Sequence, residues 1–132
     1  MKNIILCTGA SIGGFLGWFL GDFDGFLYAL LIFVVLDYIT GLMRAIVNKR
    51  LSSAIGFKGI FRKVIILAFV GIANVLDLYV LGQGEVLRTA VIFFYLANEG
   101  ISLLENAGYL GLPITQKLKD ILIQLHNKGD KI

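Results

Sequence analysis

The chain is short and very apolar, with 132 residues, 58% of them hydrophobic, and a formal net charge of +3. Its mean hydropathy of +0.85 excludes an ordinary water-soluble domain, and its length favours one membrane domain over residues 1–132. The lone cysteine, Cys7, excludes an intrachain disulfide and a paired-thiol metal or redox site. The bases lie between and after the apolar runs, so membrane orientation explains them and we expect no nucleic-acid partner.

Four apolar runs cover most of the chain, at residues 4–20, 26–43, 64–81 and 86–104. Each approaches or meets the roughly 17–25 residues that a helix needs to cross a bilayer. Backbone in lipid must satisfy its own hydrogen bonds, and the runs do not alternate as barrel strands would. The sequence therefore predicts an all-α integral membrane protein with about four transmembrane helices. The first run ends in a poor cleavage site, so we expect it to be retained and not removed as a signal peptide.

The connections between the runs alternate in charge. The first, residues 21–25, carries only acids, and the third, residues 82–85, carries a single acid. The second, residues 44–63, and the tail after Leu104 are rich in bases. The positive-inside rule then places both termini and the second connection in the cytoplasm. The bases expected at the membrane surface are Lys49, Arg50, Lys58, Arg62 and Lys63.

Part of the second connection has helical periodicity. Its apolar stripe runs from Ala54 through Phe57 and Ile60/Phe61 to Val64, and most of the bases point away from this stripe. Such a segment either lies in the headgroup layer as a separate helix or extends the third transmembrane helix, with snorkelling bases. The sequence supports both interpretations equally.

The tail predicts one more helix, over residues 113–128. Apolar residues recur there at helical spacing with polar residues mostly between them, and Pro113 suits a first helical turn. We expect a cytoplasmic amphipathic helix that rests on the bilayer or packs against a neighbouring subunit.

The first run carries a stripe of glycines. Gly9, Gly13, Gly17 and Gly21 are spaced by four residues, which gives three overlapping small-x-x-x-small steps. Glycine lets a neighbouring helix approach closely, so the stripe predicts a helix-packing ridge within or between subunits. The alternative is a ridge that faces lipid or a loosely packed neighbour.

Polar residues interrupt or border the other three runs, and ionisable groups at such depth normally face a bundle interior or a water-filled space. Asp37 and Arg44 share a helix face but are too far apart to pair directly along one straight helix, although another chain could link them. Asn74 and Asn98 favour interhelical hydrogen bonds that fix the helix register. Asp37 and Glu99 favour a polar path or a closed assembly held by charge. The full set of pore or gating candidates is Asp37, Arg44, Asn74, Asp77, Arg88, Asn98 and Glu99.

No catalytic constellation is present. The chain has one histidine, one cysteine, no G-x-S-x-G sequence, no phosphate-binding glycine loop and no metal-ligand spacing. We therefore expect a protein that is not an enzyme and that needs no cofactor or metal.

Two segments, Leu36–Leu42 and Phe94–Asn106, carry a family resemblance. Shorter matches lie between and after them, at Asn48-Lys49, Ser52-Ser53, Gly56–Gly59, Gly111–Ile114, Lys117-Leu118 and Leu122. In order and spacing over about residues 26–125 they resemble the toxin-secretion/phage-lysis holin family. The resemblance implies a small bacterial cytoplasmic-membrane protein that accumulates, forms homo-oligomers and permeabilises the membrane. Its functional partner would be an endolysin or a secreted toxin.

Two other classes of protein remain open on the residues alone. A small transporter or channel subunit would use Asp37 or Glu99 to bind a proton or cation. A structural membrane protein would use its basic connection to recruit a cytoplasmic partner. In the holin hypothesis, Asp37, Asp77 and Glu99 lie buried between helices before triggering and become hydrated in the lesion.

Overall fold

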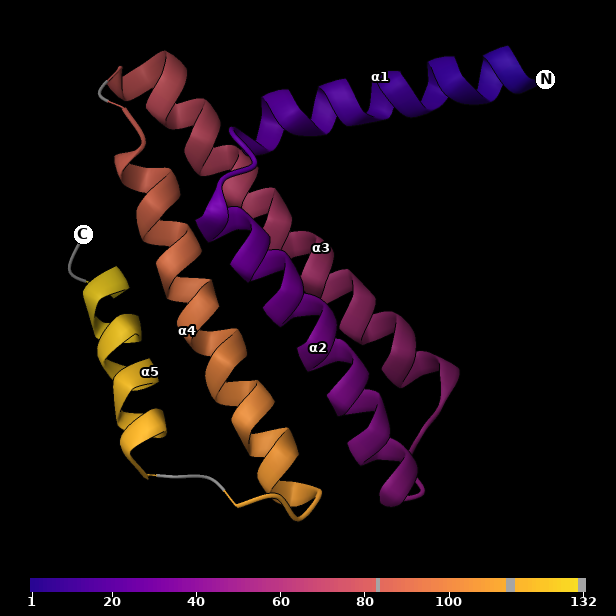
Figure 1. Cartoon of the computed structure of the whole chain (residues 1–132), viewed down its shortest axis with the longest axis vertical. Helices are drawn as coiled ribbons and strands as arrows, with labels where there is room; N and C mark the ends of the chain where they lie inside the picture. Colours follow the sequence, from indigo (N-terminus) through magenta and orange to yellow (C-terminus); the bar gives the residue numbers. More distant parts are fainter. Residues whose placement is uncertain (83, 114–115, 131–132) are drawn as a thin grey trace.

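The computed structural model describes residues 1–82, 84–113 and 116–130, which are helical apart from short connections (Figure 1). Four helices are long and apolar enough to cross a membrane, which confirms the predicted all-α membrane class. A fifth, more polar helix follows them. The elements are α1 (Lys2–Leu20), α2 (Gly25–Val47), α3 (Ser53–Leu76) with its π-helical turn η1 (Asp77–Leu81), α4 (Val86–Tyr109) and α5 (Gln116–Asp130).

Side-chain caps fix where two of the helices begin. The Asp24 carboxylate accepts the Leu27 N–H at 2.9 Å and starts α2. The Ser52 hydroxyl accepts the Ile55 N–H at 3.2 Å and starts α3. Each cap satisfies a backbone donor that the first helical turn leaves unpaired.

The end of α4 corrects the prediction for Pro113. Gly111 takes a φ of 101°, and the Leu112 N–H donates back to the Ala107 carbonyl at 3.0 Å. This is a glycine C-cap, after which proline is common because it cannot continue a helix. Pro113 therefore belongs to the termination of α4 and not to a first helical turn. Residues 114–115 lie outside the described residues, and α5 begins after them.

The amphipathic part of the second connection belongs to one continuous helix. Because α3 starts at Ser53 and runs without a break, the amphipathic segment is an extension of the third transmembrane helix. The predicted apolar stripe faces outward, since Phe57, Phe61 and Val64 are exposed. The opposite face of α3 therefore makes the contacts with the other helices.

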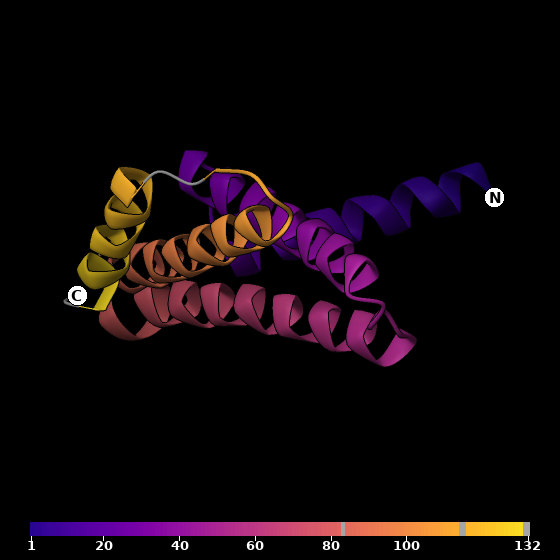
Figure 2. The same ribbon diagram turned by 90° about the horizontal axis from the view of Figure 1, so that it is seen from below.

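Four of the helices form a bundle, and α1 projects away from it. α2, α3 and α4 pack together, α5 runs antiparallel beside α4, and α1 projects sideways from the top of the bundle (Figures 1 and 2). α1 contacts the bundle at its last turn, where the Phe19 ring fills the space that a side chain at Gly71 would need. α3 thus accommodates α1 only because position 71 is glycine.

The tail helix packs against its own chain. Leu122 is buried where Gly100 leaves room, and a Cβ added at Gly100 would lie 3.1 Å from it. The His126 ring lies against Phe94, with 4.7 Å between ring centroids. Contacts with α4 of the same chain therefore support α5, while Ile121 and Ile123 stay exposed on its other side.

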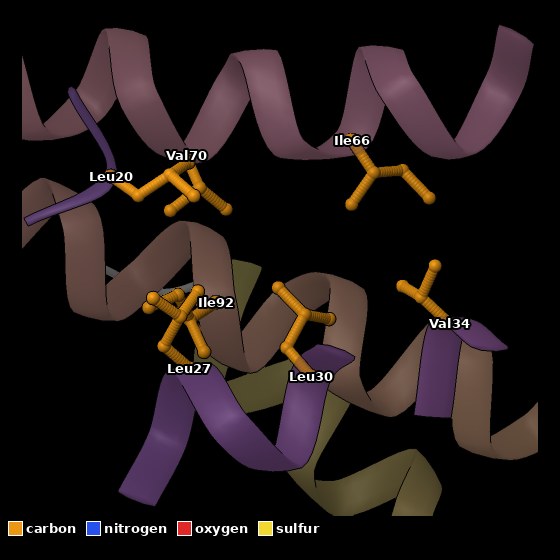
Figure 3. Packing of buried hydrophobic residues seen from close by; sticks show 7 residues of the cluster. All are labelled: Leu20, Leu27, Leu30, Val34, Ile66, Val70 and Ile92. Atoms are coloured by element: carbon orange, nitrogen blue, oxygen red, sulfur yellow. The ribbon is translucent and has the colours of Figure 1, made fainter. Parts of the chain in front are cut away.

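The apolar core occupies the half of the bundle nearest α1. Its buried side chains come from the end of α1 and from all three bundle helices, and Figure 3 shows them pointing toward one another. These apolar side chains lie between the polar groups at the two ends of the bundle. The core residues are Leu20, Leu27, Leu30, Val34, Ile66, Val70 and Ile92.

Candidate functional site: a charged vestibule between three helices

A cavity of about 800 Å³ opens between α2, α3 and α4 at the end of the bundle opposite α1. We call it the vestibule. Its lining mixes charged, amide and hydroxyl groups with apolar side chains, which is unusual for the interior of an apolar chain. The polar lining residues are Asp37, Tyr38, Lys58, Arg62, Lys63, Tyr95, Asn98, Glu99, Ser102, Glu105 and Asn106.

An ion triad lies in the vestibule. The Lys63 ammonium is 2.5 Å from a carboxylate oxygen of Asp37 and 2.5 Å from one of Glu99. The three side chains are 18%, 9% and 7% exposed, in the order Lys63, Asp37, Glu99. One cation therefore serves two carboxylates, and the fully ionised triad has one negative charge in excess. Since each side chain comes from a different helix, the triad ties α2, α3 and α4 together.

The triad lies at membrane depth. Asp37 is ten residues before the end of α2, Lys63 ten after the start of α3, and Glu99 ten before the end of α4. At about 1.5 Å per residue, each group is about 15 Å from the same end of the bundle. A hydrocarbon core is about 30 Å thick, so unpaired charges there would be costly. The shared lysine is what makes two carboxylates tolerable at this depth.

An amide extends the triad toward the helix ends. The Asn106 amide nitrogen donates to Asp37 Oδ1 at 3.2 Å and to the Thr40 hydroxyl at 3.0 Å. The Arg44 guanidinium donates to the Asn106 oxygen at 3.5 Å and lies 4.5 Å from the centroid of the Tyr109 ring. Arg44 and Asp37 are thus linked within one chain through Asn106, without a direct contact between them.

A second polar cluster lies at the α1 end of the bundle. Arg88 is only 1% exposed, and its guanidinium donates to the Leu20 carbonyl at 2.7 Å and to the Asp22 carbonyl at 2.5 Å. It also pairs with the Asp24 carboxylate at 3.0 Å. Partial burial acts to raise the pKa of Asp24, but hydrogen bonds from Leu27 and Arg88 outweigh it and hold that pKa below its usual value. Arg88 thereby fixes the turn between α1 and α2 to α4.

Asn74 and Asp77 belong to this second cluster. The Asn74 amide donates to the carbonyls of Trp18 and Phe19 at 3.0 and 3.1 Å, which satisfies acceptors at the end of α1. The Asp77 carboxylate accepts two backbone N–H groups at the start of α4, those of Leu87 at 3.0 Å and Arg88 at 2.8 Å. In this conformation Asp77 is a helix cap and not part of the vestibule.

The other predicted residues are divided between several places. Asn98 lines the vestibule, as do Lys58 and Arg62, whereas Lys49 and Arg50 lie outside it. A side chain at Gly9, Gly13 or Gly17 would meet nothing within 4 Å, so the glycine stripe is uncovered within this chain. Gly21 follows the helix with a φ of 85°, where a Cβ would lie 2.7 Å from Arg88 Nε.

Several polar residues of the vestibule are not among the predicted pore candidates, including Tyr38, Lys63, Tyr95, Ser102, Glu105 and Asn106. Two of them, Lys63 and Asn106, contact Asp37. Lys63 was grouped with the surface bases, and Asn106 was not among the pore candidates. A signal for Lys63 exists, because it lies at helical spacing before Ile66 and Val70 on the inward face of α3. Asn106 offers a weaker signal, since it lies seven residues after Glu99 and so on nearly the same face of α4.

Four apolar helices and an ion triad at membrane depth define a helical membrane protein with a buried charged site. The chain belongs to the bacteriophage holin family, whose sequence profile matches residues 14–127. It is 32% identical to a probable holin of Bacillus phage phi105 over 80% of this chain and 78% of that protein. An uncharacterized Listeria innocua protein is 44% identical over 98% and 93% of the two chains, and one from Clostridium perfringens is 43% identical over 89% of each. No solved structure matches.

Proposed function

We propose that the chain is a holin that oligomerises in the bacterial cytoplasmic membrane and permeabilises it to release an endolysin or a toxin. Both termini and the α2–α3 connection would face the cytoplasm, since the bases gather there. The observation that carries the proposal is the ion triad, a mostly buried charged site between three helices that are long and apolar enough to cross a membrane.

The core explains how the bundle stays closed. The vestibule reaches the triad from one end, while Leu30, Val34 and Ile66 lie between the triad and the Arg88 cluster at the other. Water that enters the vestibule therefore meets an apolar barrier. If neighbouring helices separate, the same carboxylates become hydrated, and this gain favours a water-filled lesion over a dry bundle.

The uncovered glycine stripe offers a contact between copies. α1 has almost no buried residues, and Gly9, Gly13 and Gly17 leave its surface open to close approach by another helix. The exposed Cys7 lies on nearly the opposite side of α1 from Gly9, since two residues turn a helix by about 200°.

Cysteine cross-linking tests this contact. In membranes, a Cys7→Ser, Gly13→Cys variant should form disulfide-linked dimers on mild oxidation, because the two glycine faces bring their backbones together. The wild-type chain, whose only cysteine is Cys7, serves as the matched control and should give a smaller dimer fraction. Equal dimer fractions in the two proteins, or a larger one for the wild type, would contradict packing through this face.

Inducible expression in a bacterium tests the function itself. We expect potassium leakage after membrane insertion, followed by lysis that needs a co-expressed endolysin. Membrane insertion without leakage and without endolysin-dependent lysis would show that the proposed function is wrong.

One observation favours a second function. A vestibule that opens at one end of the bundle and stops at a triad with one excess negative charge also suits a proton- or cation-binding transporter. Purified protein in liposomes distinguishes the two functions. Proton-coupled uptake without release of an entrapped protein favours the transporter, and release of that protein favours the holin.

A further inference from the structure

Two cations at the mouth of the vestibule are not used by the ion triad. Lys58 and Arg62 lie one turn apart on α3, and both line the cavity. Within the described part of the chain, neither forms an ion pair or a side-chain hydrogen bond. The facing wall of the mouth carries one carboxylate, Glu105 on α4, so the mouth has one positive charge in excess.

The sign of the charge differs between the mouth and the triad. Lys58 is five residues into α3, so it lies about 7.5 Å closer to the end of the bundle than Lys63. Arg62 is next to Lys63 along the helix and differs from it in direction, by about 100°. The mouth is net positive, and the triad behind it is net negative when its groups are ionised. An anion is therefore attracted into the mouth and repelled from the triad, which sets how far it can enter.

The lining indicates which anion fits. A guanidinium with an ammonium one turn away is well suited to phosphate, because arginine donates two parallel hydrogen bonds and lysine adds a point charge. Leu42, Ile55 and Ile101 place apolar surface in the same cavity. Its volume of about 800 Å³ leaves room for more than a bare ion, such as a lipid headgroup with its glycerol.

We propose that the vestibule mouth binds a phosphate group through Lys58 and Arg62. The phosphate is carried by a glycerophospholipid headgroup or is free in solution, and the apolar wall favours the lipid. Basic pockets between transmembrane helices are known to hold such headgroups. Binding there does not require that the chain permeabilise a membrane, so this inference stands or fails separately from the proposed function.

Native mass spectrometry of the purified full chain in neutral detergent tests the lipid. Phosphatidylglycerol and phosphatidylethanolamine are each added to the wild type, to Lys58→Gln/Arg62→Gln and to Lys49→Gln/Arg50→Gln. The second double variant is a matched control, because it removes two bases of the same basic region that lie outside the vestibule. We expect the wild type and the control to retain one lipid, and the Lys58/Arg62 variant to retain roughly tenfold less or lower.

Calorimetry with inorganic phosphate on lipid-free protein separates the two sources. Phosphate binding without lipid retention, lost in the Lys58/Arg62 variant alone, assigns the site to free phosphate. Lipid retention lost in that variant alone assigns it to the headgroup. The proposal is overturned if neither ligand binds the wild type, or if the two double variants behave alike. All four substituted side chains are exposed, and equal thermal transitions check that the fold is kept.

Discussion

Replacing Arg88 with methionine should lower the free energy of unfolding by about 3–5 kcal/mol, because it leaves two backbone carbonyls and a partly buried carboxylate without their charged donor. Methionine keeps most of the apolar stem but removes the donors that hold the carbonyls of Leu20 and Asp22 and the carboxylate of Asp24. These acceptors join α1 and α2 to the start of α4, so α1 should also become more accessible to protease. Unfolding by SDS in mixed micelles, followed by circular dichroism, measures the loss.

Two further variants separate charge from geometry in this cluster. Arg88→Lys keeps the charge but cannot reach three acceptors at once, so its loss should be intermediate. Arg50→Met removes an exposed arginine that has no ion pair among the described residues, and should change the unfolding free energy by less than about 0.5 kcal/mol. An Arg88→Met protein as stable as Arg50→Met would mean that the junction does not depend on Arg88.

The number of helices could be predicted from the sequence, but not where α3 starts. A bilayer of about 30 Å fixes how long an apolar helix must be, so runs of that length identify four helices. The third run was expected from residue 64, whereas α3 begins at Ser53. The bases Lys58, Arg62 and Lys63 end the apolar run without ending the helix. Hydropathy averages over every face of a helix, so these bases lower it although the outward face of the same segment, with Phe57 and Phe61, stays apolar.

The site was only partly predictable. Asp37 and Glu99 were indicated by the cost of burying a carboxylate in hydrocarbon, and the structure places both in the vestibule. Their partner was not indicated, because Lys63 is next to Arg62 in a basic segment. Adjacent residues of a helix point about 100° apart, so Arg62 faces the mouth while Lys63 reaches the two carboxylates. Composition shows only that the segment is basic. The position of each base around the helix axis decides whether it faces the mouth or the triad.

Two residues on the same face of a helix do not necessarily belong to the same site. Arg88 and Glu99 are eleven residues apart on nearly one face of α4, yet they belong to different clusters. About 16 Å of helix separates them, and apolar core side chains such as Ile92 fill that interval. Which cluster each residue joins depends on the neighbouring helices, and a single sequence does not report their packing.

Replacing Lys63 with methionine should have the largest functional effect. The substitution leaves Asp37 and Glu99 as two uncompensated carboxylates in a site that is mostly buried. Their desolvation and mutual repulsion should lower the free energy of unfolding by about 3–5 kcal/mol. Water drawn to the two carboxylates should also weaken the apolar barrier that the core forms next to them. We therefore expect lysis to begin earlier than with the wild type at equal membrane abundance, when optical density and potassium efflux are followed after induction.

A charge-matched variant shows whether the effect comes from the ion triad. Lys63→Met combined with Asp37→Asn and Glu99→Gln removes all three charges and keeps the side chains close to their original size. This triple variant should recover most of the lost stability and delay lysis relative to Lys63→Met, because buried neutral groups do not need a counter-ion. Arg50→Met removes an exposed cation that lies outside the vestibule and should leave the timing unchanged. If the triple variant lyses as early as Lys63→Met, the uncompensated carboxylates do not control the onset.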